Sequence, residues 1–467
     1  MGAGDRMPVV SRYTLYFKAE EGIYILLNSL TGAIDIADEV PIDVLRRIER
    51  GENYRGDLFY YLKERGYIFE SSLDEEELIK KHLRRWKRKV CESPLTFVVG
   101  VTTQCNFACK YCFQQHMQRR RRNNNSRNDR KIVLLFNAMD NIVKEEGERE
   151  VNLSLFGGEP LLPSNKCVIT QILENAKERG FNFYDVITNG YYLKEYIPLL
   201  KKYDVKNVQV TLDGTRKIHN FLRLTKSGKG TFDRIVEGID EALKNDIFIT
   251  VRVNVNGYNI QDLPALAKYI IQKSWNKFPN FNAQLGLVYP YGFDSEDFPY
   301  LSEDVALKHI LEMYDKYPEM NVYDMGGWSM VKNILSSLET GMPFEQKFAY
   351  CGANTTTYAF DPLGKIYACF DAIGMEEMSI GEYFPRYNIN KELKKKWRKN
   401  VFEKSPCSDC KYALLCGGGC IFHTLLSGRD FSEPICPSID RSLNILLGWY
   451  YRHNKDLLLG KRREGHV

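Results

Sequence analysis

Short apolar runs alternate with longer amphipathic stretches through the middle of the chain. Each run holds five to eight residues, and the stretches between the runs repeat apolar residues at helical spacing. The runs that we expect to form strands are Thr96–Thr102, Val151–Phe156, Phe183–Ile187, Val208–Leu212, Phe248–Val255 and Asn282–Val288. Strands that alternate with helices predict parallel βαβ units, and therefore an α/β fold arranged as an open or closed barrel.

The segment before these runs has a pattern typical of a small α+β module. It predicts extended segments and two helices, at Tyr13–Phe17, Gly22–Leu27, Ala33–Ala37, Pro41–Glu49 and Gly56–Arg65. The tetrapeptide Ser72-Leu73-Asp74-Glu75 then predicts a capping box that opens a connecting helix. Its acidic first turn and basic end favour this helix, because they complement the macrodipole.

Composition and charge narrow the classes of protein. The chain has 467 residues, of which 44% are hydrophobic and 27% charged, and its length suggests about three domains. It has no apolar run near the ~20 residues of a membrane span, and no secretory signal at its start, so we expect a cytoplasmic protein without a membrane partner. A net charge of +5 does not indicate a nucleic-acid partner.

Twelve cysteines remain to be explained in a reducing compartment, where metal binding or catalysis is favoured over disulfides. Three of them, Cys105, Cys109 and Cys112, share one loop after the first barrel strand, with no fourth cysteine or close histidine. A structural zinc site normally closes with four ligands. An iron–sulfur cubane held by three cysteines instead leaves one iron open. A zinc site with a remote fourth ligand is the alternative.

The loop resembles that of the radical S-adenosylmethionine (SAM) family, which has three residues and then two between its cysteines. An aromatic residue precedes the last cysteine, as Tyr111 does here. The resemblance implies a partial (β/α)6 barrel in which the three cysteines hold a [4Fe–4S] cluster. In that family the open iron binds SAM, and an electron cleaves SAM to a 5′-deoxyadenosyl radical that takes a hydrogen atom from the substrate.

A second motif of the family is similar to Gly157-Gly158-Glu159-Pro160. By this resemblance, the paired glycines allow a close backbone approach, and the acid and the backbone hold the methionine ammonium group of SAM. The tetrapeptide on its own is weak evidence, because glycine pairs are common in turns. Its position at the end of a predicted strand, in the order of the family, strengthens the assignment.

Two further strand ends carry weaker matches. Asn189 lies where the family often contacts the ribose of SAM, and Arg223 follows Asp213-Gly214 and resembles the arginine that pairs with the methionine carboxylate. A simple turn is the alternative for Asn189-Gly190, and a surface salt bridge is the alternative for Arg223.

A second cysteine-rich region, turn-rich and with little apolar periodicity, follows the barrel, and such a region is expected to need metal. Its seven cysteines are Cys351, Cys369, Cys407, Cys410, Cys416, Cys420 and Cys436. Their spacing resembles the SPASM domain, which carries auxiliary clusters in radical SAM enzymes that act on peptides and proteins. A pair of zinc-ribbon-like sites is the alternative.

The family pattern divides these cysteines into two sets. It assigns Cys407, Cys410, Cys416 and Cys436 to an outer [4Fe–4S] cluster, and Cys351, Cys369 and Cys420 to an inner one. One ligand is missing, because the fuller family version carries another cysteine where Thr355, Thr356 and Thr357 stand here. Three candidates remain for the fourth ligand of the inner cluster: a substrate group, a distant thiol such as Cys91 or Cys167, or solvent. Cys91 and Cys167 are otherwise ordinary thiols.

The N-terminal module looks like the small winged-helix domain that binds leader peptides by adding them as a strand to a sheet edge. A scaffold module that binds nothing is the alternative. The run from Arg119 to Lys131 is strongly basic. Most such runs are solvated loops, but this one could steer an acidic peptide to the barrel. Neutralising Arg119, Arg120, Arg121 and Arg122 should then weaken substrate binding at low salt.

These observations predict a radical SAM/SPASM peptide maturase with three [4Fe–4S] clusters, SAM, a precursor-peptide substrate and a flavodoxin- or ferredoxin-like reductant. The expected product is an oxidative crosslink, either a thioether or a carbon–carbon bond; epimerisation stays open. One alternative is a formylglycine-forming enzyme with Asp371 as base. Another is a non-catalytic, metal-bound peptide adaptor. The predicted units are a winged-helix-like module over 1–73, a linker helix over 74–94, the barrel over 95–310, a bridging helical region over 311–347, the SPASM domain over 348–440 and a C-terminal helix over 441–467.

Overall fold

The computed structural model describes residues 7–114, 129–290, 297–325 and 328–463 of the chain. Arg119, Arg120, Arg121 and Arg122, for which a steering role is predicted above, lie outside these ranges. None of the helices in these ranges is both long and apolar enough to cross a membrane.

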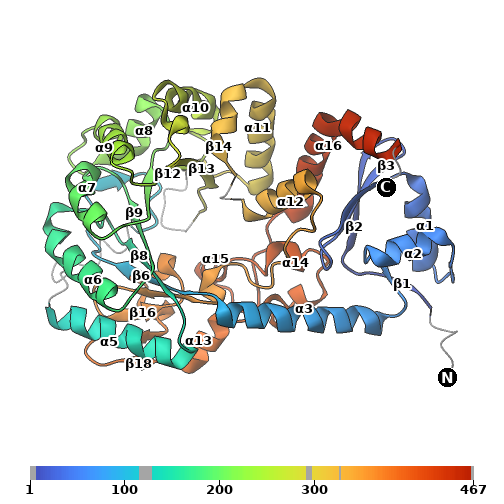
Figure 1. Ribbon diagram of the computed structural model, residues 1–467, viewed down its shortest axis with the longest axis horizontal. Coiled ribbons are helices and arrows are strands. Elements are labelled where there is room, and N and C mark those ends of the chain that lie inside the picture. Colours follow the sequence, from blue (N-terminus) through green and yellow to red (C-terminus); the bar gives the residue numbers. More distant parts are fainter. Residues whose placement is uncertain (1–6, 115–128, 291–296, 326–327, 464–467) are drawn as a thin grey trace.

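A sheet of parallel strands lies in the left half of the molecule as seen in Figure 1, with helices on its outer face. Its central strands are β6 (Leu95–Gly100), β8 (Val151–Phe156), β9 (Phe183–Thr188), β10 (Asn207–Thr211), β12 (Ile249–Val255) and β13 (Phe281–Leu287). They pair side by side in the order β13-β12-β10-β9-β8-β6. The intervening helices include α5 (Asp129–Glu146), α6 (Lys166–Glu178), α7 (Leu193–Lys202), α8 (Arg216–Leu222), α9 (Phe232–Lys244) and α10 (Leu263–Gln272). The predicted α/β fold is confirmed.

The two faces of the strands explain where the site lies. In β12, residues Val251 and Val253 are fully buried in the apolar core, while Arg252 and Asn254 alternate with them and line a cavity. Helix α9 buries an apolar stripe that includes Ile235 and Ile239, at the four-residue spacing of one helix face. The core therefore lies between sheet and helices, and polar side chains point to the other face of the sheet.

The sheet extends beyond the predicted strands at both edges. Strand β15 (Thr357–Phe360) pairs in parallel with β6, and β16 (Lys365–Tyr367), β17 (Gly381–Glu382) and β18 (Asn388–Ile389) continue antiparallel from it. On the other edge, β14 (Tyr323–Asp324) pairs with β13. These short runs were not predicted, because two to four residues are too few to show a period. The first part of the cysteine-rich region thus shares a sheet with the barrel.

The N-terminal module contains a three-stranded antiparallel sheet and two helices, as the sequence predicts. Its elements are β2 (Thr14–Glu20), β3 (Ile23–Asn28), β4 (Ile34–Ala37), α1 (Glu39–Glu49), α2 (Asp57–Glu64) and the short pair β1 (Val9–Val10) and β5 (Ile68–Phe69). Strand β2 lies at the edge of its sheet in the described part of the chain. Helix α3 (Ser72–Glu92) then leads to β6.

The predicted capping box at the start of α3 is wrong. The N-cap residue is Ser71, one residue earlier than expected, and its side chain makes no cap hydrogen bond but donates to Asp74 Oδ2 at 2.8 Å. Glu75, which would complete the box, instead accepts hydrogen bonds from Ser11 Oγ at 2.6 Å and Arg12 N at 3.1 Å. The Glu75 carboxylate, which the cap would need, is therefore bound by the N-terminal module instead.

The last helix of the chain is tied to the N-terminal module. Helix α16 (Ile439–Arg463) lies beside the N-terminal sheet (Figure 1), and Tyr451 Oη donates a hydrogen bond of 2.8 Å to Glu20. A second contact is an apolar cluster that includes Tyr13, Leu30 and Leu414, all nearly or fully buried. The cysteine-rich region is thus packed against both the barrel and the N-terminal module.

We expect Leu30→Ala to lower the free energy of unfolding by about 2–5 kcal/mol, because Leu30 is fully buried in this cluster. Urea unfolding of the anaerobic protein, followed by circular dichroism, measures this loss. Leu73→Ala is the matched control, since Leu73 is 63% exposed on α3, and its effect should stay within about 0.5 kcal/mol. Equal losses in the two variants would contradict the role given to the cluster.

Candidate active site

A cavity of about 390 Å³ opens at the carboxyl ends of the barrel strands. The three cysteines of the first loop line it together with side chains from several strand ends: Cys105, Cys109, Cys112, Gly157, Gly158, Asn189, Arg223, Arg252, Asn254 and Asp371 are among the lining residues. The loop is fixed by strand β7 (Phe107–Cys109), which pairs antiparallel with β11 (Arg223–Thr225). Arg223 stands opposite Cys109 in this pair.

Gly157 and Gly158 let their backbone approach the cysteine loop more closely than a side chain would permit. A Cβ atom at Gly158 would lie 2.2 Å from the carbonyl oxygen of Gln104, and Gly157 has a φ of +132°. Hydrogen bonds of 2.8 Å join Gly158 N to Thr102 O and Glu159 N to Gln104 O. Glycine is therefore required here by space at Gly158 and by backbone conformation at Gly157.

Glu159 is fully buried and holds two strand ends together. Its carboxylate accepts hydrogen bonds from Thr188 Oγ1 at 2.5 Å, from Asn189 N at 2.7 Å and from Leu161 N at 2.9 Å. Burial raises the pKa of Glu159 to about 6, while these hydrogen bonds act to lower it. Neither Glu159 nor Pro160 is among the residues that line the cavity, so the backbone of the two glycines is the part of this motif that faces it.

Asn189 combines a turn with a place in the cavity wall. Its Oδ1 accepts a hydrogen bond of 2.9 Å from Tyr191 N, which is the geometry of a local side-chain turn. Its Nδ2 donates to Asn106 Oδ1 at 2.9 Å, and this bond ties the residue to the cysteine loop. The turn interpretation and the interpretation as a cavity residue are therefore compatible.

A buried polar network surrounds Tyr111. The Tyr111 hydroxyl donates to Asp213 and accepts from Arg223 Nη1 at 2.7 Å and from Asn254 Nδ2 at 3.2 Å. Arg223 also pairs with Asp213, at 3.6 Å between Nη1 and Oδ2. The alternative of a surface salt bridge for Arg223 is thus wrong, because Arg223 is 7% exposed and Asp213 is fully buried.

The charges of this network support each other. Burial raises the pKa of Asp213, and the Arg223 guanidinium opposes that rise. Among the described residues, nothing accepts a hydrogen bond from the buried Nε of Arg223. A buried donor without a partner is costly, so an anionic group that entered the cavity beside Arg223 would be stabilised.

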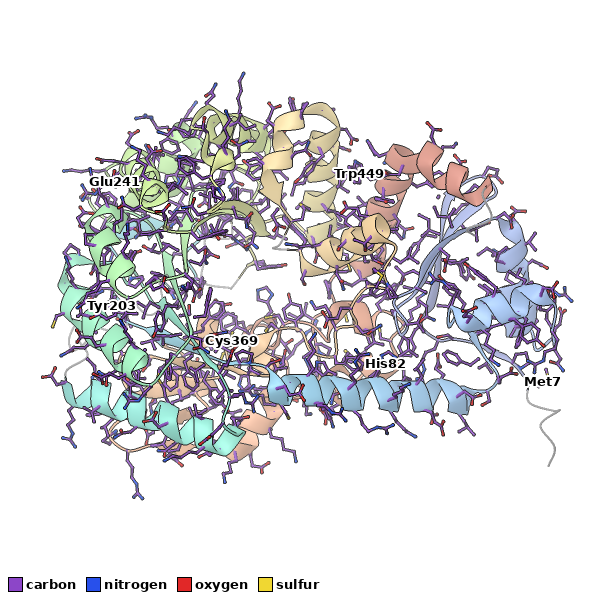
Figure 2. The ribbon with its side chains drawn as sticks, viewed as in Figure 1. Met7, His82, Tyr203, Glu241, Cys369 and Trp449 are labelled. Atoms are coloured by element: carbon purple, nitrogen blue, oxygen red, sulfur yellow. The ribbon has the colours of Figure 1, made fainter. Side chains whose placement is uncertain are left out.

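The structure also gathers the seven later cysteines into two sets. A cavity of about 80 Å³ is lined by Cys407, Cys410, Cys416 and Cys436, which are the four residues that the resemblance assigns to one cluster. Cys351, Cys369 and Cys420 lie close enough for their charges to interact. Cys369 lies beside the barrel strands, near the centre of the molecule (Figure 2). These are the groups that the resemblance assigns to an outer and an inner cluster, and their roles as ligands stay a prediction.

Backbone N–H groups point at the inner set of sulfurs. Cys351 accepts a hydrogen bond from the backbone of Ala353, Cys369 from that of Asp371, and Cys420 from those of Phe422 and His423. Such donors favour thiolate over thiol. Burial nevertheless raises the pKa of these cysteines, and raises that of Cys105 and Cys109 to about 12. The thiols would therefore stay protonated without a cation, and a metal centre would deprotonate them.

The donor sets suit iron–sulfur clusters, because each of them consists of cysteine sulfurs alone. Cys91 on α3 and Cys167 on α6 are exposed and line none of these cavities, and neither do Thr355, Thr356 and Thr357.

Asp371 enters the barrel cavity from the cysteine-rich region. Its neighbour Phe370 packs against Phe156 of β8, with ring centroids 5.3 Å apart, and both aromatic rings line the cavity. Burial raises the pKa of Asp371 to about 7. A carboxyl group therefore stands in the same cavity as Cys105, Cys109 and Cys112, as the sequence-based hypothesis of a base requires.

Several polar residues of the cavity wall are not among those predicted from the sequence. Gln209 and Thr211 of β10, and Arg252 and Asn254 of β12, face the cavity. They occupy alternate positions within otherwise apolar strands. That period of two could have identified them as residues of the inner face, because successive side chains of a strand point to opposite faces.

A second cavity, of about 480 Å³, adjoins the first. Leu287 and Tyr289 line both, and the second is also lined by Cys416, Cys420 and Cys436. Tyr289 packs edge-on against His423, with ring centroids 4.9 Å apart. The space around the first cysteine loop is therefore continued toward both later cysteine sets.

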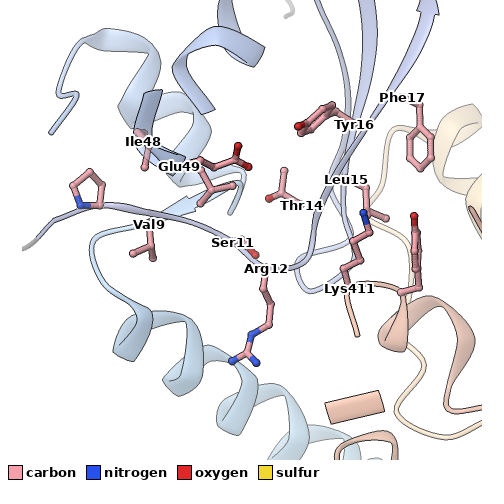
Figure 3. A pocket seen from close by; sticks show the side chains of 13 residues that line it. Val9, Ser11, Arg12, Thr14, Leu15, Tyr16, Phe17, Ile48, Glu49 and Lys411 are labelled. Carbon is pink, nitrogen blue, oxygen red and sulfur yellow. The ribbon is translucent and has the colours of Figure 1, made fainter. Parts of the chain in front are cut away.

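A third cavity lies between the N-terminal module and the residues that follow Cys410. It measures about 580 Å³, and side chains of β2 and α1 face it together with Lys411 from the cysteine-rich region (Figure 3). Tyr16 of β2 is 38% exposed here, and Glu49 adds a carboxylate. The cavity thus borders the edge strand of the N-terminal sheet.

Residues 99–270 match the family model described as Radical SAM superfamily. The chain is 21% identical over 456 residues to the "Radical SAM cyclopropyl synthase TigE" of Paramaledivibacter caminithermalis, covering 89% of this chain and 90% of that protein. It is 23% identical over 343 residues to the "Cysteine-type anaerobic sulfatase-maturating enzyme" of Clostridium novyi, covering 68% of this chain and 85% of that protein.

Solved structures give the same picture of the fold. "Native anSMEcpe with bound AdoMet" superposes with a TM-score of 0.58 at 18% identity, over 79% of this chain and 98% of that one. SuiB of Streptococcus suis superposes with a TM-score of 0.51 at 15% identity, over 91% of this chain and 99% of that one. Residues 99–270 therefore form a domain of the Radical SAM superfamily, and the chain is similar over most of its length to enzymes named for that chemistry or for sulfatase maturation.

Proposed function

We propose that the chain is a peptide maturase that uses radical SAM chemistry to crosslink a ribosomally made precursor peptide. The superfamily implies a [4Fe–4S] cluster and SAM. The observation that carries the proposal is the pair of adjoining cavities, one lined by the first three cysteines and the other by cysteines of both later sets. A neighbour titled "Native anSMEcpe with bound AdoMet and Kp18Cys peptide" supports a peptide substrate, with a TM-score of 0.57.

In this proposal Cys105, Cys109 and Cys112 would hold the SAM-binding cluster. When bound, this cluster and SAM supply a 5′-deoxyadenosyl radical that abstracts hydrogen from the substrate. The backbone of Gly157 and Gly158 would bind the methionine ammonium group, because its close approach leaves no side chain in the way.

Other groups of the chain would orient SAM. The free Nε–H of Arg223 would meet the methionine carboxylate, and Asn189 would meet the ribose. Tyr111 and Asp213 would act indirectly, by holding Arg223 and the cysteine loop in place. Glu159 would likewise position the strand end that carries Asn189.

Two auxiliary [4Fe–4S] clusters complete the proposed enzyme. Cys407, Cys410, Cys416 and Cys436 would hold the outer one, and Cys351, Cys369 and Cys420 the inner one. A crosslink removes two hydrogens from the substrate. One leaves as a hydrogen atom, and the other leaves as a proton and an electron. An auxiliary cluster can accept the electron. We therefore favour a thioether or a carbon–carbon bond as the product.

Formylglycine formation is the second candidate function, and one observation favours it. Asp371 lines the barrel cavity, where it could accept a proton from a substrate cysteine or serine. The similarity to a protein named as a sulfatase-maturating enzyme points the same way. A crosslinking enzyme could use the same carboxylate, so product connectivity has to decide between the two.

The N-terminal module would bind the leader part of the precursor. Strand β2 is an edge strand, and the cavity of about 580 Å³ runs along it (Figure 3). An extended peptide could pair with this edge through main-chain hydrogen bonds. A cytoplasmic flavodoxin- or ferredoxin-like protein would supply electrons.

Replacing Cys105, Cys109 and Cys112 together by Ala should remove one cluster of three. Anaerobic iron analysis should then fall from about twelve to about eight irons per chain, since a cubane holds four. SAM should perturb the electron paramagnetic resonance spectrum of the wild type but not of this variant. Cys91→Ala and Cys167→Ala serve as controls that keep full iron. Zinc in place of iron, with no response to SAM, would favour the non-catalytic adaptor.

Gly158→Ala should weaken SAM binding at least tenfold, because the new Cβ would lie 2.2 Å from the Gln104 carbonyl and displace the cysteine loop. Equilibrium binding of SAM to the reconstituted protein measures this. Gly448→Ala is the control, since its Cβ would meet only Arg452, at 3.5 Å. If Gly158→Ala bound SAM as tightly as wild type, the glycine pair would not be part of the SAM site.

Incubation with SAM, reductant and the peptide encoded by a neighbouring small open reading frame should give a product lighter by two hydrogen atoms. Tandem mass spectrometry should then show fragments missing between two linked residues. An aldehyde at a single Cys or Ser position would identify formylglycine formation instead. Peptide without a change in mass, in a reaction that consumes SAM, would show that this peptide is not the substrate.

A further inference from the structure

Lys404 is a buried lysine in the cysteine-rich region, directly after a short helical turn (Val401–Glu403). Its side chain is 1% exposed, and its ammonium donates one hydrogen bond, of 3.1 Å, to the carbonyl of Gly418. No ion pair formed within the described residues includes Lys404. An ammonium group taken out of water without a counter-ion is costly, so this position needs an explanation.

Thiols from both auxiliary cysteine sets lie within electrostatic range of this ammonium. Those whose charge acts on Lys404 are Cys407 and Cys416 of the outer set, and Cys351 and Cys420 of the inner set. Gly418, which holds the ammonium, belongs to the loop between Cys416 and Cys420 and lines the cavity of the outer set. The lysine therefore lies where the two sets meet.

The loop between Cys416 and Cys420 also points backbone N–H groups at a cysteine sulfur. The backbone N–H groups of Gly418 and Gly419 donate hydrogen bonds to Cys416. Neutral thiols would leave the buried charge of Lys404 uncompensated, whereas thiolate-bound clusters carry net negative charge and would act as its counter-ion. The buried charge of Lys404 is thus explained if both cysteine sets hold anionic clusters.

We propose that Lys404 is a positioning residue that sets the reduction potential of the auxiliary clusters through its charge. A fixed positive charge favours adding an electron to a buried centre nearby. In the proposed crosslinking, the substrate would lose one hydrogen atom to the deoxyadenosyl radical, then a proton to water and one electron, which an auxiliary cluster held by the later cysteines would accept. Lys404 would make that last transfer favourable. The inference rests on the proposed function, because it requires the auxiliary clusters.

The test is a potentiometric titration followed by electron paramagnetic resonance. It uses the full chain with Cys105, Cys109 and Cys112 replaced by Ala, so that only the auxiliary clusters contribute. Lys404→Met keeps the length of the side chain and removes the charge, Lys404→Arg keeps the charge, and Lys395→Met is the control at an exposed lysine of helix α13 (Lys391–Trp397). Iron content is measured for each protein before the titration.

We expect Lys404→Met to make one-electron reduction of at least one auxiliary cluster less favourable by on the order of tenfold. This corresponds to a midpoint lower by about 59 mV. Lys404→Arg and Lys395→Met should titrate like the parent. If Lys404→Met holds about eight irons and its midpoints equal those of the parent, the inference is overturned while the proposed function stands.

Iron content separates the remaining outcomes. Loss of iron from Lys404→Met but not from Lys404→Arg would support the inference, because charge would then be what the clusters need. Loss from both variants would overturn it, since the site would require the shape of lysine. A parent protein without auxiliary iron would overturn the proposed three-cluster enzyme, and the role of Lys404 with it.

Discussion

The close approach of two backbone segments is the constraint on which the barrel site depends. Gly158 lies so near Gln104 that no side chain fits between them, and the hydrogen bond from Glu159 N to Gln104 O fixes the distance. The cysteine loop begins at the next residue, Cys105. Its position is therefore set by the end of β8, and the side chains of Glu159 and Asn189 extend this restraint to the end of β9.

A buried polar network on the other side of the cysteine loop restrains the loop further. Tyr111 is 102 residues away from Asp213 and 112 residues away from Arg223 in the sequence, and the three side chains satisfy part of each other's hydrogen bonding. Buried polar groups of this kind stabilise little in net terms, but they disfavour every arrangement that leaves one of them unpaired. The cysteine loop is thus held in one geometry before any cofactor binds.

The sequence allowed the barrel to be predicted because its strands are long enough to show a pattern. Runs such as Val151–Phe156 carry apolar residues at alternate or successive positions, are bounded by turn residues and are separated by helices. The cysteine motifs could be read because their spacing is local. Strand β15 could not, since four residues carry no period and its partner β6 lies more than 250 residues away. The cap of α3 was wrong for a related reason: Glu75 is bonded to Ser11, and only tertiary contact decides that.

The shared sheet has a consequence for the proposed chemistry. Tyr358 of β15 stands opposite Phe97 of β6, the strand that leads into the first cysteine loop. Phe370, between Cys369 and Asp371, packs on Phe156 at the end of β8. The inner cysteine set is thus attached to the barrel through strand pairing and core packing.

A crosslinking enzyme must hold one substrate residue near both the source of the radical and the acceptor of the remaining electron. Strand pairing fixes that geometry without a domain closure, because a paired strand cannot shift by one residue without turning its side chains to the other face. In the proposed enzyme, substrate selection would then fall to the N-terminal module and the cavity walls, while the spacing of the redox centres stays constant.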